Sequence, residues 1–457
     1  MILFSLGFYK NQWNAVAMED VLYRRNVSET FIFGRLVKSR QHGVFSAGGL
    51  LGIGDVTESN FDNATIQNQR RKYNKGTDFA YGYWTYKSQP GFQGIAYSLA
   101  DSWTDFAPST NLLIFRSSIS IALALVLAGV CLWFLLEFGW IASISAVIYI
   151  LISSKLAIFG GNLFWSLWSF YLPLLVLAFM LRRAHGKGES TLTFRFAVVV
   201  FFLSLIKILF SGFEFITSAL LLTTVPVIYY AVLKGWEWKL FIRAWVIASI
   251  GLAASVLVGL LLLLLQIRID IGNYRDALTH IIFSFRNRTY DYEVLKNGVP
   301  DSFRVAVEKT LYVIENNLNG YAFSLSPRFS VNSGVLRDVL DGRYLFLIIL
   351  FAIASVFVLA THAYLSKDKN NRVGPALTAA CWYSALAPLS WFVVFRDHAF
   401  GHTTLDFLVW EMPFTLFGFA LVGYAVSVLS RLGLQQNYFS KRTPSSQTPP
   451  SQISSAI

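Results

Sequence analysis

The chain has 457 residues, of which 55% are apolar and only 14% are charged, and its formal net charge is +12. Soluble domains carry about a quarter charged residues, so this composition excludes a soluble enzyme with a single membrane anchor. Aromatic residues make up 16% of the chain, which suits a protein with many membrane interfaces. The two cysteines, Cys131 and Cys381, both lie in apolar runs, which excludes a disulfide framework and a cysteine-based zinc site.

Nine apolar runs are long enough to cross a membrane, because about 20 apolar residues in a helix span the hydrocarbon core. They lie at 118–136, 139–158, 163–181, 194–210, 214–233, 244–266, 344–364, 374–395 and 407–430. We therefore predict an all-α polytopic membrane protein with about nine transmembrane helices. Residues 1–8 are apolar but too short to span, so we expect a tenth, N-terminal helix that is truncated or mis-started.

Two long polar stretches divide these runs and define five expected segments. They are a truncated first helix with the first loop (1–111), a six-helix transmembrane block (112–266), a second loop (267–343), a three-helix transmembrane block (344–430) and a low-complexity tail (431–457) expected to be disordered. Both loops are expected to contain amphipathic helices. In the first loop, such a helix begins near Gly34 and leads into a Gly-rich loop that can approach a neighbouring group of any kind closely.

Lysine and arginine are concentrated in the short connections on one side of the predicted membrane. These residues are Arg182, Arg183, Lys187, Arg195, Lys234, Lys239, Arg243, Lys367, Lys369, Arg372, Arg431, Lys441 and Arg442. The opposite short connections contain only Arg396, so the positive-inside rule places the C-terminus in the cytoplasm and both long loops outside. Most of the positive charge is thus a topogenic signal that also attracts anionic lipid. We expect no nucleic-acid partner, although the pI is near 9.5.

Polar residues gather toward the outer ends of the predicted spans, where an ionisable residue is costly and usually functional. The members of this group are Lys155, Asn162, Lys207, Glu214, Arg396, His398 and His402. Each has an ordinary explanation of its own: the lysines can snorkel to the interface, Glu214 can cap a helix N-terminus, the amide can serve tight packing, and the histidines can be interfacial. Their joint occurrence on one side predicts a binding site at the outer leaflet.

Adjacent carboxylates, Glu19 and Asp20, open the first loop. Such a pair can act as a general base, or hold a divalent cation such as Mg²⁺ or Mn²⁺ through its oxygens, or it can be a solvated acidic pair. His398 and His402 have the spacing of a helical metal pair but lack the Glu of the zincin pattern. The residues leave the need for a metal open.

Two further stretches suit a phosphorylated or sugar-bearing ligand. The second loop carries eight arginines whose forks suit phosphate, although a solvated helical face would look the same. They are Arg268, Arg275, Arg286, Arg288, Arg304, Arg328, Arg337 and Arg343. Aromatic residues at 81–86 and at Trp165 and Trp168 suit stacking on a saccharide, but equally an ordinary turn and an aromatic belt.

This layout resembles the membrane glycosyltransferases of the GT-C superfamily, which use polyprenyl-phosphate-linked sugars. In that family an acidic residue or pair lies in the first outer loop shortly after the first transmembrane helix, and Glu19-Asp20 would match that position. The blocks Gly160-Gly161-Asn162, Gly212-Phe213-Glu214 and 398–402 are similar to short blocks in bacterial membrane proteins of this general type. The family pattern has a complete transmembrane helix before the acidic residues, and the expected first helix here is truncated. The match of Glu19-Asp20 depends on that helix, so this departure weakens it.

The resemblance implies an enzyme of the bacterial inner membrane that moves a sugar from a polyprenyl-phosphate donor to an envelope glycan or lipid acceptor at the outer leaflet. Glu19 or Asp20 would take the acceptor proton, and the outer polar group would bind the donor phosphate. The alternative is a non-enzymatic transporter, or an assembly or polymerisation factor for cell-surface polysaccharide. A transporter predicts polar residues at mid-depth, which the apolar inner halves of the spans do not offer.

Overall fold

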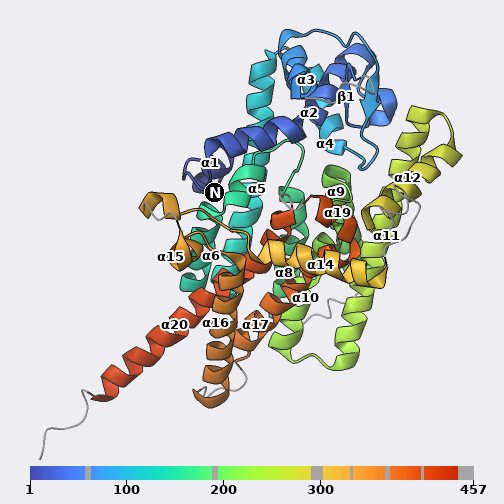
Figure 1. The fold of residues 1–457 in the computed structure, drawn as a ribbon. Helices are drawn as coiled ribbons and strands as arrows, with labels where there is room; N and C mark the ends of the chain where they lie inside the picture. The colour runs from blue at the N-terminus through green and yellow to red at the C-terminus, as the bar shows by residue number, and fades with distance from the viewer. Residues whose placement is uncertain are drawn as a thin grey trace, which may run out of the picture.

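The computed structural model describes residues 1–56, 63–187, 194–289, 302–329, 333–365, 371–402 and 406–440. In this part of the chain helices predominate, with one small sheet (Figure 1). Seven of the described segments are long and apolar enough to cross a membrane. They are Pro108–Phe138, Phe194–Ser211, Ile216–Lys234, Trp238–Ile271, Tyr344–Tyr364, Val373–Val394 and Phe407–Leu432. These segments make the chain a polytopic, α-helical integral membrane protein.

The first 103 residues form a small unit that we call the N-terminal cap. It comprises α1 (Ile2–Lys10), α2 (Met18–His42), the 3-10 helix η1 (Ser46–Gly49), β1 (Gly52–Gly54), α3 (Asn63–Lys75), β2 (Tyr83–Thr85) and α4 (Phe92–Trp103). The two strands are antiparallel, with Gly52 opposite Thr85. They were not expected from the sequence, because three residues are too few to show an alternating pattern. Gly34 of α2 makes the packing possible, since an added Cβ would lie 2.0 Å from the carbonyl oxygen of Gly52.

The first helical block follows the cap. It contains α5 (Pro108–Phe138), α6 (Trp140–Ile152), α7 (Ser154–Phe159), α8 (Trp168–Lys187), α9 (Phe194–Ser211), α10 (Ile216–Lys234) and α11 (Trp238–Ile271). The chain continues through α12 (Tyr274–Thr289), α14 (Phe303–Leu318), η2 (Ser326–Phe329) and α15 (Gly334–Leu340) in the second loop. It ends with α16 (Tyr344–Leu365), α17 (Val373–Ser384), α18 (Leu386–Val394), α19 (Arg396–Gly401), η3 (Asp406–Glu411) and α20 (Phe414–Ser440).

Several predicted boundaries are wrong. The span expected at 139–158 breaks after α6, because Ser153 leaves the helix and its hydroxyl caps α7 by accepting a hydrogen bond from the Leu156 amide. The span expected at 163–181 begins only at Trp168. The one expected at 374–395 agrees with the candidate span Val373–Val394, in which α17 and α18 follow each other at Ala385. The first two are the expected spans that the seven candidates do not include.

The C-terminal end of the described chain also differs from expectation. Helix α20 continues to Ser440, so the segment predicted to be disordered from residue 431 begins as helix. Residues 441–457 lie outside the described residues, as do Lys367 and Lys369, on which the predicted orientation partly depends.

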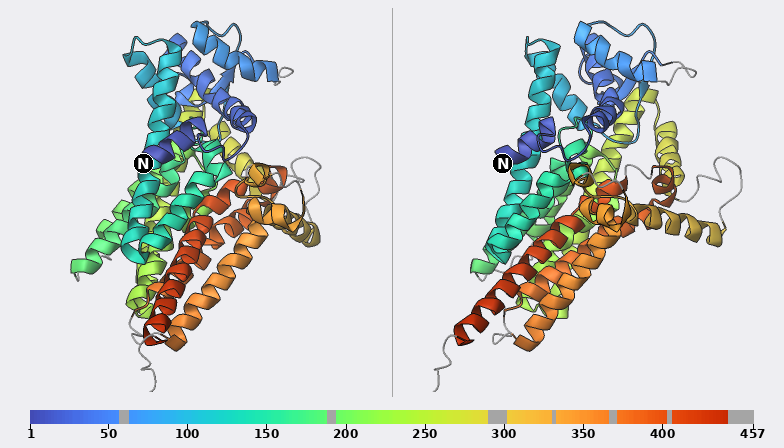
Figure 2. Two further views of the ribbon diagram at one scale, coloured as in Figure 1. Left: turned by 90° about the vertical axis from the view of Figure 1, so that its left-hand side faces the viewer. Right: turned by 60° about the vertical axis from the view of Figure 1, so that its left-hand side comes forward.

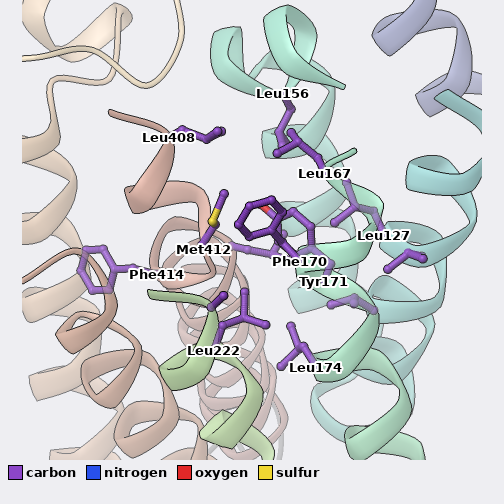
Figure 3. Packing of buried hydrophobic residues seen from close by; sticks show 14 of the residues in the cluster. Leu127, Leu156, Leu167, Phe170, Tyr171, Leu174, Leu222, Leu408, Met412 and Phe414 are labelled. Atoms are coloured by element: carbon purple, nitrogen blue, oxygen red, sulfur yellow. The ribbon is translucent and has the colours of Figure 1, made fainter. Parts of the chain in front are cut away.

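The core of the bundle lies where α5, α8, α10 and α20 meet. Leu127, Leu174, Leu222 and Met412 are fully buried there, with Tyr171 packed among them (Figure 3). Apolar side chains that point away from this core remain exposed, as expected for helices that face lipid. The N-terminal cap covers one end of the bundle, and α20 runs to the opposite end (Figure 2).

Candidate functional site

The turn between α9 and α10 places a carboxylate, Glu214, at the edge of the N-terminal cap. Gly212 permits this turn, since its φ is +63° and an added Cβ would lie 2.2 Å from Gln89. Lys207 of α9 holds the turn in place: its Nζ donates to the carbonyl oxygens of Gly212 at 2.9 Å and Glu214 at 2.6 Å. Lys207 is 2% exposed and lies over the ring of Phe170, so it does not snorkel. Nor does Glu214 cap α10, which begins without a side-chain cap.

The Glu214 carboxylate collects partners from three other segments. Arg288 of α12 donates from Nη1 to Oε1 at 2.8 Å, and the Tyr86 hydroxyl donates to the same oxygen at 3.3 Å. His398 of α19 lies with Nε2 3.4 Å from Oε2. We call Tyr86, Glu214, Arg288 and His398, together with the neighbouring His402, the Glu214 cluster. It joins the cap, the α9–α10 turn, α12 of the second loop and α19.

Electrostatics keep this carboxylate ionised. Burial alone would raise the pKa of Glu214, but Arg288 and His398 together hold that pKa below its ordinary value. Burial alone would lower the pKa of Arg288, but Glu214 and Tyr86 raise it by more, so the pKa lies above its ordinary value. Glu214 is therefore a fixed counter-charge at neutral pH rather than a group that accepts a proton.

His398 and His402 lie side by side at the rim of the cluster, with ring centroids 4.5 Å apart. The pKa of His402 is lowered by burial and then by the neighbouring His398, so His402 is neutral at pH 7. In the described residues no group of three or more His, Cys, Asp or Glu side chains is arranged to hold a metal ion. Arg396 was predicted for the same site, but its Nε donates to the Asp397 carboxylate at 2.9 Å. That carboxylate also lies 3.9 Å from the Lys309 ammonium.

An apolar groove adjoins the Glu214 cluster and contains about 680 Å³ of space that includes open exterior. We call it the α11–α12 groove. Its lining comprises Lys87, Ser88, Phe213, Ile216, Val256, Leu260, Leu263, Ile281, Ser284, Phe285, Arg288 and Phe395. The two cations in this lining are each paired, Arg288 with Glu214 and Lys87 with Asp270 at 3.1 Å. Arg288 belongs both to the α11–α12 groove and to the Glu214 cluster, so the apolar groove and the polar cluster are in direct contact.

The predicted carboxylate pair lies elsewhere. Glu19 and Asp20 are exposed in the first turn of α2. Asp20 and Glu411 are both close enough to act electrostatically on Lys155, whose Nζ lies 4.8 Å from the centre of the Phe407 ring. The structure thus brings two of the predicted residues, Asp20 and Lys155, into a second polar neighbourhood. No contact described for these residues joins that neighbourhood to the Glu214 cluster.

Buried Glu411 is the second carboxylate of this neighbourhood. Its carboxylate accepts hydrogen bonds from Tyr149 and, at 3.3 Å, from Thr415. Glu411 lies in η3, far from Lys155 in the sequence, so only the packing of α7 on η3 brings the two charges together.

Asn162 and the tryptophan-rich run serve packing. Asn162 is fully buried and donates to the Ser28 hydroxyl at 2.8 Å, which ties the turn after α7 to α2. Trp165 is 6% exposed and stacks on Phe215 with centroids 5.7 Å apart. Phe215 in turn packs against Trp391, which contacts the His398 ring edge-on. These aromatic rings form the wall behind the Glu214 cluster and do not present faces to a sugar.

Sequence reasoning missed the residues that complete the cluster. Arg288 was one of eight arginines in the second loop, and only its contact with Glu214, 74 positions earlier, sets it apart. Tyr86 and Lys87 lay in an aromatic and polar segment for which stacking on a saccharide and an ordinary turn were equally open.

Comparison with protein-family models, with curated proteins and with solved structures finds no match for this chain.

Proposed function

We propose that this chain is a membrane glycosyltransferase that moves a sugar from a polyprenyl-phosphate donor to a glycan or lipid acceptor at the extracytoplasmic end of its helix bundle. One observation supports the proposal above all others: the apolar α11–α12 groove shares Arg288 with the Glu214 cluster. A polyprenyl phosphate has the same two parts, a long apolar tail and an anionic head.

The tail is assigned to the groove. Val256, Leu260 and Leu263 of α11 and Ile281 of α12 present aliphatic surface along it. Each methylene buried there gains about 0.8 kcal/mol relative to water. Bilayer lipids are equally apolar and compete for the same surface, so contacts to the head must provide the selectivity.

The head is assigned to Arg288 and Lys87, the two cations in the groove lining. Buried Lys207 is a third cation beside the Glu214 cluster. The carboxylates that pair with these cations are Glu214 and Asp270, so this end of the groove has three cations and two carboxylates. A guanidinium fork suits phosphate oxygens. The same charges stabilise the phosphate as it departs, which is the main electrostatic demand of this reaction.

The transfer step needs one proton acceptor. The acceptor hydroxyl oxygen forms a bond to the anomeric carbon, the bond from that carbon to the phosphate oxygen breaks, and its electron pair leaves with the phosphate. We assign the hydroxyl proton to Nδ1 of His398, because Nε2 of the same ring faces the ionised Glu214. A carboxylate that binds one ring nitrogen fixes the orientation of the imidazole and directs its other nitrogen toward the substrate. The prediction from the family resemblance gives this role to Glu19 or Asp20 instead.

Sugar transfer by the purified chain in liposomes tests the proposal and separates the two assignments. The donors are a panel of synthetic polyprenyl-phosphate hexoses and pentoses, and the product is radiolabelled acceptor. We expect His398→Gln to lower the rate about 100-fold or more, the usual contribution of a general base. His362→Gln, a change in the last turn of α16, is the matched control and should transfer normally.

Two outcomes overturn parts of this account. Loss of transfer in Glu19→Gln or Asp20→Asn with normal transfer in His398→Gln would assign the base to the acidic pair. Tight donor binding without transfer of any sugar would favour the non-enzymatic alternative.

A further inference from the structure

A second hollow lies between α1, α3 and α5, away from the α11–α12 groove, and contains about 740 Å³ of space that includes open exterior. Its polar lining consists of Tyr9, Arg70, Asn74, Ser109, Thr110 and Arg116. Two of these side chains are cations and none is acidic. The proposed function uses none of these residues.

Arg116 lies at the wall of this hollow and is paired with Glu29. One of its terminal nitrogens donates to Glu29, whose other carboxylate oxygen accepts from the Leu163 amide at 3.1 Å. The Arg116 side chain is 16% exposed and lines the hollow, so part of this guanidinium is open to a ligand there. Arg70, exposed on α3, faces the hollow with a second guanidinium.

The first turn of α5 adds donors and a favourable dipole. Pro108 begins the helix, and the preceding Ala107 gives no side-chain cap, so the positive end of the helix faces the hollow unneutralised. Ser109 and Thr110 supply hydroxyl groups in this turn. This arrangement complements the two arginines, since helix N-termini favour anions.

The hollow also borders exposed apolar side chains. Leu113 lines it and is 51% exposed, and Ile114 beside it is 41% exposed. Both belong to α5, the first of the seven candidate spans. A ligand whose charged head lies between the arginines can therefore extend an apolar part along α5 into the bilayer.

We infer that this hollow binds a phosphate ester with net negative charge, the chemistry of an anionic phospholipid headgroup, between Arg70, Arg116 and the first turn of α5. Phosphate oxygens match the arginine forks and the two hydroxyl groups, and the adjoining leucine suits an acyl chain. Such a lipid would tie α3 of the N-terminal cap to the membrane through the α5 span. The binding is independent of sugar transfer, so it can be tested whether or not the proposed function holds.

The test is lipid retention by the full-length chain. The protein is reconstituted in nanodiscs with equal amounts of phosphatidylglycerol and phosphatidylcholine, extracted in mild detergent, and examined by native mass spectrometry. We expect wild type to retain phosphatidylglycerol and Arg70→Gln to retain about tenfold less, the effect of losing one charged hydrogen bond. Arg71→Gln is the matched control, because it removes the same charge from the same helix and Arg71 does not line the hollow.

Competition with soluble glycerol phosphate separates the two sources of the phosphate ester. Displacement at millimolar concentration would show that the headgroup alone is recognised, and resistance would show that the lipid is the ligand; both agree with the inference. Equal retention by Arg70→Gln and Arg71→Gln, or equal retention of phosphatidylcholine by wild type, would overturn it. Arg70 is exposed, so its loss should not unfold the chain, and matching melting temperatures check this.

Discussion

Replacing Glu214 with Gln removes one negative charge and keeps the size of the side chain. In the wild type, Arg288 donates to this carboxylate at 2.8 Å, and the two side chains are only 17% and 7% exposed. The variant therefore leaves the Arg288 guanidinium nearly buried without its counter-charge. It also removes the charge that orients the His398 ring.

The size of the effect follows from the burial of the pair. Removing one partner of a buried ion pair costs about 3–5 kcal/mol, because the other charge stays desolvated. Since Arg288 keeps some contact with solvent, we expect Glu214→Gln to lower the free energy of unfolding by about 3 kcal/mol. The matched control is Glu308→Gln in the Arg304–Glu308 pair of α14, whose side chains are 87% and 58% exposed. That change should cost at most about 0.5 kcal/mol.

Equilibrium unfolding by SDS titration in mixed micelles measures both changes. The double variant Glu214→Gln/Arg288→Gln leaves neither charge of the pair behind. Its loss in free energy of unfolding should therefore be smaller than the sum of the two single-variant losses by at least about 1 kcal/mol. If Glu214→Gln costs no more than Glu308→Gln, or if the double variant is additive, the ion pair does not hold these elements together and the description of the cluster fails.

Two further changes test the packing and the electrostatics. Gly34→Ala places a Cβ 2.0 Å from the Gly52 carbonyl oxygen, so it should lower the melting temperature markedly, whereas Gly82→Ala, with nothing within 4 Å, should not; equal melting temperatures would contradict the packing of α2 on β1. The pKa of His402 is depressed by burial and by His398, so its contribution to stability is present above the ordinary value of 6.5 and is lost as pH falls through the folded pKa. His402→Gln should flatten the decline in melting temperature between neutral pH and about pH 5, and an unchanged slope would count against a neutral His402.

The long elements of this fold follow from the sequence, because the length of an apolar run fixes whether it can span a membrane. The interruptions do not. Ser153 ends α6 inside a continuous apolar run, where hydropathy has no signal and only the capping of α7 shows the break. The two short strands depend on the close approach of Gly34 and Gly52, which is a property of tertiary packing.

The candidate site was predictable in position more than in composition. Glu214 lies in a short turn and His398 in the short helix α19, both between predicted spans, so the spans alone predicted that they lie at the same end of the bundle. Arg288 could not be singled out, because its role depends on where α12 folds back after α11. Asn162 and Arg396 lie near the same end, but the structure pairs them with Ser28 and Asp397.

The central claim is that the α11–α12 groove holds the tail of a polyprenyl phosphate whose head lies at Arg288. A polyprenyl-phosphate analogue with a diazirine in its tail tests this claim, with cross-linked peptides identified by mass spectrometry. Leu260→Trp fills the groove, whereas Leu261→Trp adds the same ring to the exposed face of α11. The account predicts labelling of α11 and α12 that Leu260→Trp abolishes and Leu261→Trp preserves. Equal labelling of the two variants, or labelling spread over all lipid-facing helices, would contradict it.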